Sequence, residues 1–274
     1  MAAPVAGNST PWRGAIDVAG GLLRLTVAGE GAPLILLHGW TLDHRMWQPQ
    51  IADLARDFTL IMPDRRGFGR SSAPPDLARE AEDIARIADS LQLDRFSLLG
   101  LSQGASVALD CAATLADRVA ALAVCGAPLP KLVERAETLD LALYQGLAEE
   151  GDLAAMRADW ARHPLMQACT ASAREALAAM LADYDGRDLR APSSLPDVTR
   201  DAAAALAMPV LALAGEHDTP WRHACAAALA EAAPLGRFAL VDGAGHVANL
   251  DNPIRFDALL REFLQSAAPQ GPLS

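Results

Sequence analysis

Three residue types that can cooperate in nucleophilic catalysis follow three different apolar runs of this sequence. Ser102 follows the run from Phe96, Asp218 follows the run from Val210, and His246 follows the run from Phe238. A serine hydroxyl is a weak nucleophile at neutral pH, and a histidine can take its proton and later protonate the leaving group. A buried carboxylate on the other ring nitrogen fixes the tautomer of that histidine. The order Ser, Asp, His therefore predicts a triad that forms an acyl-enzyme on Ser102.

The glycines around Ser102 indicate how its hydroxyl is presented. The segment Gly100-Leu101-Ser102-Gln103-Gly104 joins an apolar strand pattern to a run of small residues with helical spacing. Strand and helix almost touch at so tight a turn, so the positions two before and two after the serine must be small. Such a turn strains Ser102 and points the backbone N–H of Gln103 to where an oxyanion would form. A plain turn with a capping serine fits the same five residues, so the pattern alone leaves both open.

Other residues compete for two of the triad positions. His217 is an alternative base and Glu216 an alternative acid, although the side chain of His217 should point away from its neighbour Asp218. The sequence has six histidines, and the others are expected to order loops or lie at the surface: His38, His44, His163 and His223. Asp64 is expected to anchor the loop with Arg65 and Arg66, which we interpret as a structural loop behind the pocket.

Composition excludes several classes of partner. The 274 residues carry a net charge of −11, which argues against nucleic acid or an anionic membrane surface. The four cysteines are scattered, and neither metal-ligand spacing nor a dinucleotide-binding glycine pattern is present, so we expect no metal and no cofactor. The expected partner is a small-molecule substrate, and a homodimer stays an open alternative.

The sequence also favours a cytoplasmic protein. The segment Met1 to Trp12 lacks the basic start and apolar block of a signal peptide. The longest apolar stretch, Ala202 to Ala214, is too short to span a bilayer and contains Pro209. Scattered cysteines of this kind are typical of buried small side chains in a reducing compartment.

The elements that must position the triad alternate along the chain. Continuous apolar runs of the doubly buried kind predict parallel strands, with amphipathic helices between them. This alternation predicts an α/β fold with a mostly parallel sheet covered on both faces. The expected strands are 34–37, 59–62, 96–99, 119–125, 210–214 and 238–241, after an antiparallel hairpin over 16–28.

The alternation breaks once. The segment 131–205 contains no convincing strand and has the pattern of several amphipathic helices, which predicts a helical insertion. We therefore expect a core made of residues 14–130 and 206–267, a helical cap over 131–205, and a loose N-terminal tail over 1–13.

Five motifs in order, each after a strand pattern, give the chain a family resemblance. They are His38-Gly39-Trp40, Asp64 to Ser71, the serine turn, Gly215-Glu216-His217-Asp218 and Gly243-Ala244-Gly245-His246. The chain resembles the α/β-hydrolase-fold enzymes from about residue 16 to residue 264. The resemblance implies the catalytic residues Ser102, Asp218 and His246, an oxyanion hole from the N–H groups of Trp40 and Gln103, and a cap that covers the site.

The resemblance is strongest to small cytoplasmic esterases and lactonases of the 3-oxoadipate enol-lactonase kind. It implies hydrolysis of an ester or lactone. Serine stands where related dehalogenases and epoxide hydrolases have aspartate, which argues against both reactions. Four residues are candidates for the substrate pocket, with loop ordering or helix packing as the alternative: His38, Gly39, Tyr144 and Tyr184.

Other chemistry is known on the same fold. The main alternative is a cofactor-free dioxygenase in which His246 deprotonates an aromatic hydroxyl and Ser102 only orients the substrate. C–C bond cleavage and acyl transfer are further alternatives, and a ligand receptor without catalysis is another.

Overall fold

The computed structural model describes residues 11–191, 194, 195 and 197–267. Within them, eight strands form one sheet in the order β1-β2-β4-β3-β5-β6-β7-β8. The strands β1 and β2 pair antiparallel, as do β2 and β4, and every other neighbouring pair is parallel. The bounds are β1 Trp12–Val18, β2 Gly21–Ala28, β3 Ala32–Leu37, β4 Phe58–Pro63, β5 Phe96–Leu101, β6 Val119–Cys125, β7 Val210–Gly215 and β8 Gly236–Val241.

The central strands are apolar because both faces of the sheet are covered. Every residue of β7 is buried, whereas the edge strand β8 exposes Phe238 and Leu240 by 41% each. The parallel register places Leu37 beside Gly100, Leu101 beside Cys125, and Gly215 beside Val241. The carboxyl ends of β3, β5, β6, β7 and β8 therefore lie along one edge, and the loops that follow them meet there.

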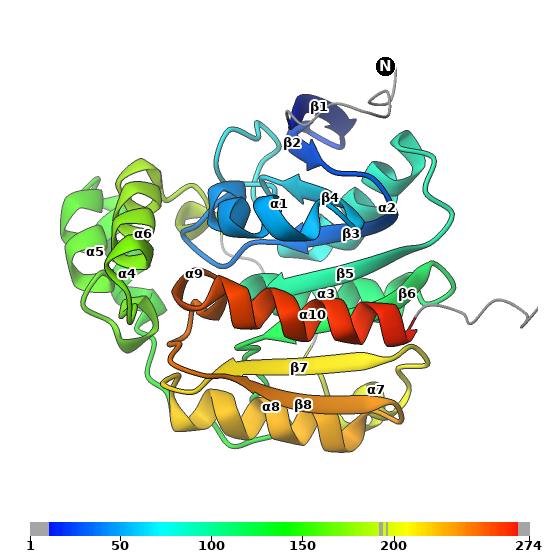
Figure 1. The fold of residues 1–274 in the computed structure, drawn as a ribbon. Coiled ribbons are helices and arrows are strands. Elements are labelled where there is room, and N and C mark those ends of the chain that lie inside the picture. Colours follow the sequence, from blue (N-terminus) through cyan, green and yellow to red (C-terminus); the bar gives the residue numbers. More distant parts are fainter. Residues whose placement is uncertain (1–10, 192–193, 196, 268–274) are drawn as a thin grey trace, which may run out of the picture.

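Helices cover the sheet on both sides (Figure 1). One apolar layer packs α1 and α10 on the sheet, and the other packs α2, α3 and α8 on its opposite face. The helices of these layers are α1 Gln48–Leu54, α2 Glu80–Ser90, α3 Gln103–Thr114, α8 Pro220–Ala232, α9 Ala248–Asp251 and α10 Pro253–Ala267. The expected doubly covered, mostly parallel α/β sheet is confirmed.

Between β6 and β7 the described residues form helices and no strand. The helices α4 Leu141–Glu149, α5 Leu153–Trp160 and α6 Ala171–Asp183 lie together at the left of Figure 1, beyond the carboxyl ends of the strands. Of two short 3-10 helices, η3 Pro164–Met166 lies between α5 and α6, and η4 Asp188–Arg190 follows α6. The helix α7 Arg200–Ala204 instead packs against α8. The exact bounds of a cap domain stay a prediction.

Several local details differ from the expectation. The strand β1 begins at Trp12, so two residues of the expected tail pair with β2, while residues 1–10 lie outside the described part. Two helices begin with a 3-10 turn, η1 His44–Trp47 before α1 and η2 Leu77–Arg79 before α2. The helix α9 was not expected at all.

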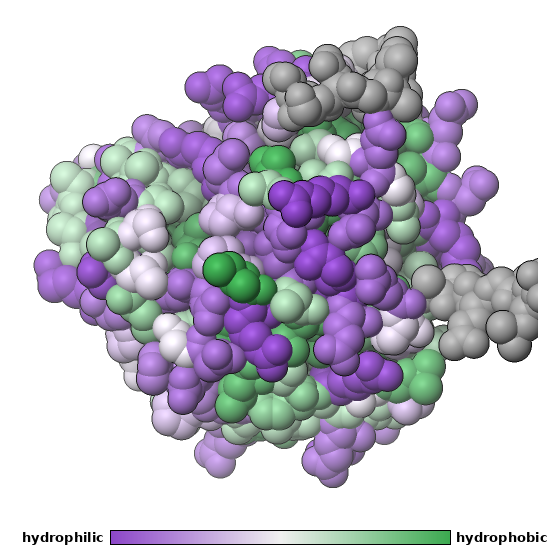
Figure 2. Space-filling view, in the orientation of Figure 1, coloured by the Kyte–Doolittle hydropathy of each residue, from purple (hydrophilic) through white to green (hydrophobic). Residues whose placement is uncertain are grey.

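The surface agrees with the acidic composition. Hydrophilic side chains are spread over the face shown in Figure 2, with paler apolar side chains over the cap helices. None of the described helices is long and apolar enough to cross a membrane.

Candidate active site

Ser102 occupies a strained turn between β5 and α3. Its backbone angles are φ 55° and ψ −117°, outside the regions that ordinary residues prefer. A Cβ on Gly100 would lie 2.2 Å from the carbonyl oxygen of Gly104, and one on Gly104 would lie 2.2 Å from that of Leu37. Among the described residues, the Ser102 side chain caps no backbone N–H of α3. Of the two arrangements that fit the motif, the structure has the strained turn rather than the capping serine.

His246 and Asp218 form a buried pair beside this turn. The Nδ1 of His246 lies 2.8 Å from Oδ2 of Asp218, and the two residues are 5% and 7% exposed. Burial acts to raise the pKa of Asp218, but the charge and hydrogen bond of His246 outweigh it and hold that pKa below its usual range. An ionised Asp218 accepts the Nδ1–H, which leaves Nε2 of His246 as the basic nitrogen. That nitrogen is buried, with no hydrogen-bond partner in the described structure.

The competing acid and base lie elsewhere. The side chains of His217 and Glu216 are 59% and 52% exposed, and they face each other at 4.0 Å. Glu216 accepts a hydrogen bond from the N–H of Gly243 and so holds the loop before His246. Neither residue lines the cavity at Ser102. The structure thus brings Ser102, His246 and Asp218 together and leaves their competitors at the surface.

The peptide between Gly39 and Trp40 is held in one orientation. Nε2 of His38 accepts from the N–H of Arg65 at 2.9 Å, so its Nδ1 carries the proton and donates to the carbonyl of Gly39 at 2.8 Å. Burial and the charge of Arg65 lower the pKa of His38 to about 4, which keeps the ring neutral. Because a trans peptide points C=O and N–H in opposite directions, this bond also aims the N–H of Trp40.

Trp40 and Gln103 can both offer a backbone N–H to a substrate. Gln103 is the first residue of α3, where backbone donors have no partner inside the helix. Within the part of the chain that the structure describes, neither N–H donates a hydrogen bond. Both residues line the cavity with Ser102, which is the arrangement that an oxyanion hole requires.

A buried ion pair supports this side of the site. Arg65 binds both carboxylate oxygens of Glu80 at 2.7 Å, the carbonyl of His38 at 2.8 Å and the side-chain oxygen of Gln103 at 3.0 Å. It therefore ties the loop after β3 to the start of α3. The expectation that the loop with Arg65 lies wholly behind the pocket is wrong, because its residues Arg66 and Phe68 line the cavity. Asp64 anchors this loop by accepting from His44 and from the N–H of Arg70.

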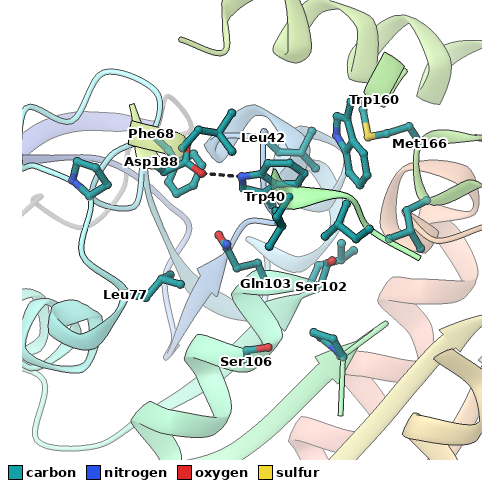
Figure 3. Close-up of a pocket in the computed structure, with 18 of the residues that line it drawn as sticks. Trp40, Leu42, Phe68, Leu77, Ser102, Gln103, Ser106, Trp160, Met166 and Asp188 are labelled. Atoms are coloured by element: carbon teal, nitrogen blue, oxygen red, sulfur yellow. Dashed lines mark hydrogen bonds between the residues drawn. The ribbon is translucent and has the colours of Figure 1, made fainter. Parts of the chain in front are cut away.

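The cavity holds about 240 Å³ and is mainly apolar (Figure 3). Ser102, Gln103, His246, Gly39 and Trp40 line it. Its apolar wall comes from core and cap alike: Leu42, Phe68, Leu101, Trp160, Leu165 and Met166.

Three residues expected in the pocket lie behind its described wall instead. His38 is fully buried by the bonds given above. The hydroxyl of Tyr144 is turned to Asp159 at 2.9 Å, and that of Tyr184 to Asp188 at 2.6 Å. Their polar atoms are thus bound within the protein rather than presented to a ligand.

Sequence reasoning missed several residues of this site. The segment between β6 and β7 contributes Trp160 and Asp188 to the cavity wall. Arg222 binds Glu137 and the carbonyl of Gly126, beside His246. No local pattern marks these residues, because each acts through a partner far away in the chain.

One cluster has the composition of a metal site. Ligand atoms of Asp43, His44 and Asp64 lie within 4.8 Å of one another. Asp43 is bound by the backbone and guanidinium of Arg45, and Asp64 by His44 and Arg70. These contacts hold the loop, so we assign the cluster no metal.

Comparisons with known proteins give the family of the chain. A family model described as alpha/beta hydrolase fold matches residues 32–253. Soluble epoxide hydrolase of Corynebacterium sp. is 35% identical over 133 residues, 47% of this chain and 41% of that protein. This chain thus matches about two-fifths of the length of that relative.

Other relatives match almost end to end. The 2-succinyl-6-hydroxy-2,4-cyclohexadiene-1-carboxylate synthase of Salmonella paratyphi C is 31% identical, over 81% of this chain and 90% of that protein. The structure of the enol-lactonase from Burkholderia xenovorans LB400 has a TM-score of 0.76 and 25% identity, and the match covers 92% of this chain and 100% of that chain. Since the family model matches most of its length, the chain belongs to the alpha/beta hydrolase fold family.

Proposed function

We propose that this protein hydrolyses a carboxylic ester or lactone through an acyl-enzyme on Ser102. The observation that carries the proposal is the strained serine beside the unpartnered Nε2 of His246 in one cavity. The similarity to an enol-lactonase supports the lactone as one substrate class.

The reaction starts when Oγ of Ser102 attacks the carbonyl carbon and its proton passes to Nε2 of His246. Asp218 stabilises the imidazolium that forms. The N–H groups of Trp40 and Gln103 bind the oxygen that becomes negative, a role in which one donor is worth about 10²–10³ in kcat. Collapse breaks the bond to the leaving oxygen, which His246 protonates.

Water completes the cycle. His246 takes a proton from the water as its oxygen attacks the acyl carbon. When the bond to Ser102 breaks, His246 returns this proton to Oγ of Ser102 and the acid leaves. A lactone would open in the first step, so its alcohol and acid groups stay on one molecule. The mainly apolar wall favours an acyl part that is small and mostly uncharged.

The test is labelling with a fluorophosphonate probe together with turnover of p-nitrophenyl acetate and butyrate. We expect the wild type to label and turn over, and Ser102→Ala to lose both. Ser90→Ala, which removes an exposed serine at the end of α2, should behave as wild type. A wild-type protein that neither labels nor turns over would contradict the proposal.

A second candidate is chemistry in which His246 acts as base without an acyl-enzyme. The nearly full-length similarity to a synthase favours keeping it. Cofactor-free oxygenation of a hydroxylated aromatic compound is one such reaction. Oxygen consumption that survives Ser102→Ala and is lost in His246→Ala would support this candidate.

A further inference from the structure

Asp188 is a carboxylate of the cap that faces the cavity (Figure 3). It lies in η4, and its Oδ2 accepts from the indole N–H of Trp40 at 2.6 Å. Its Oδ1 accepts from the hydroxyl of Tyr184, also at 2.6 Å. Trp40 stands 148 positions earlier in the chain, so this hydrogen bond joins the cap to the loop after β3.

Asp188 forms no salt bridge within the described part of the chain. Among the described residues, no lysine, arginine or histidine lies within ion-pair distance of it. The adjacent Arg187 binds Asp185 and the carbonyls of Ser71 and Gly69. Burial raises the pKa of Asp188, although its hydrogen bonds and, to a smaller extent, the charge of Arg65 act the other way. The contribution of Asp188 must therefore come from its two neutral donors rather than from a salt bridge.

The cap also packs directly on the ring of Trp40. The ring centroids of Trp160, Tyr144 and Tyr184 lie 4.8, 5.9 and 6.2 Å from that of Trp40. Trp40 is thus held at two ends, with its backbone fixed through His38 and its indole fixed by the cap. The backbone N–H of this same residue is the proposed oxyanion donor.

We propose that Asp188 is a positioning residue that fastens the cap to the oxyanion loop through Trp40. The proposal rests on the proposed function for its kinetic consequence. With Asp188 bound, the indole holds the peptide N–H in line with the oxygen that becomes charged. Since that interaction strengthens only in the transition state, its loss lowers kcat more than it raises KM.

The kinetic test compares Asp188→Ala with Asp188→Asn. Alanine removes both acceptors, so kcat should fall about tenfold, while KM stays within about twofold of wild type. This fall is smaller than the loss of about 10²–10³ in kcat that follows when an oxyanion donor is removed outright. Asparagine can accept from the indole N–H with its oxygen and donate to the Tyr184 oxygen with its amide. It should therefore retain most of the activity. If Asp188→Asn falls as far as Asp188→Ala, the charge matters and the proposal is wrong.

Asp159→Ala is the matched control. Asp159 also accepts from a cap tyrosine, Tyr144, at 2.9 Å, but it does not bind the indole of Trp40. The loss of this bond should leave kcat within about twofold of wild type. An equal fall in both alanine variants would show that any damage to the cap has the same effect, which would overturn the specific role of Asp188.

A second readout is independent of turnover. The indole N–H signals of ¹⁵N-tryptophan-labelled protein report each ring, and Trp40→Phe assigns the signal of Trp40. We expect Asp188→Ala to shift this signal and speed its hydrogen exchange, while Asp188→Asn and Asp159→Ala leave it protected. An unmoved signal in Asp188→Ala overturns the proposal. If the signal moves but the wild type has no hydrolase activity, the contact stands and the proposed function falls.

Discussion

A methyl group at position 126 should separate His246 from its partner. Gly126 directly follows β6 with φ +60°, and its carbonyl accepts from Arg222 at 2.6 Å. A Cβ there would lie 2.6 Å from Cε1 and 2.8 Å from Nδ1 of His246. It would also lie 3.3 Å from Oδ2 of Asp218. The substitution Gly126→Ala should therefore disrupt the hydrogen bond between Asp218 and His246 that orients the imidazole.

The structure gives the size of the effect. Ordinary contacts of a Cβ begin at 3.4 Å, so the ring of His246 must retreat by about 0.8 Å. A displacement of about 1 Å in a catalytic group can lower the rate about 10²-fold, and we expect a loss of that order in kcat. Separately, a non-glycine residue in the left-handed region costs about 1–2 kcal/mol of unfolding free energy. For a chain of this size that corresponds to a fall of about 2–8 °C in Tm.

Gly151→Ala separates the two effects. Gly151 has φ +83°, and no described atom lies within 4 Å of the Cβ that alanine would add. Both variants should show a similar fall in Tm when thermal unfolding is monitored by circular dichroism. Only Gly126→Ala should lose turnover of p-nitrophenyl butyrate. If Gly126→Ala keeps kcat within about threefold of wild type, or if Gly151→Ala loses as much, the reasoning about His246 is refuted.

Two further predictions concern buried carboxylates. Glu80→Ala leaves the charge of Arg65 buried and unpaired, so the free energy of unfolding measured in urea should fall by about 3–5 kcal/mol. The exposed Glu82→Ala should lower the same free energy by at most about 0.5 kcal/mol. Burial raises the pKa of Asp257 to about 7, so the folded protein resists the ionisation of this carboxyl. The contribution of Asp257 to the free energy of unfolding is therefore lost as the pH rises towards 7. Asp257→Asn, which keeps the acceptor for Gln50, should raise Tm at pH 8 and change it little at pH 4; an equal gain at both would contradict this pKa.

The fold could be predicted because its signals are local. The runs at β3, β6 and β7 are apolar without interruption, and that at β5 is interrupted only by Ser97, which occurs where both faces of a strand are buried. The glycines at 100 and 104 mark the serine turn because no larger residue fits between strand and helix. Each of these constraints acts within a few residues, so the sequence displays it directly.

The cavity wall could not be predicted in the same way. Tyr144 and Tyr184 were candidates because both lie in the expected cap, yet the hydroxyl of Tyr144 is bound to Asp159 and that of Tyr184 to Asp188. Which way a cap side chain faces depends on how α4, α5 and η4 pack on the core. That packing joins residues more than a hundred positions apart, and no periodicity in the sequence encodes it.

Three residues from different parts of the chain support the peptide that carries the proposed oxyanion donor. His38 binds the carbonyl of Gly39, Arg65 holds His38 through both its backbone N–H and its guanidinium, and Asp188 binds the indole of Trp40. Arg65 acts through His38 on the carbonyl of Gly39, whereas Asp188 acts on the indole, so the loss of either support leaves the other in place. Removal of a single support should therefore slow the proposed reaction, whereas removal of the Ser102 hydroxyl, which has no substitute, should abolish it.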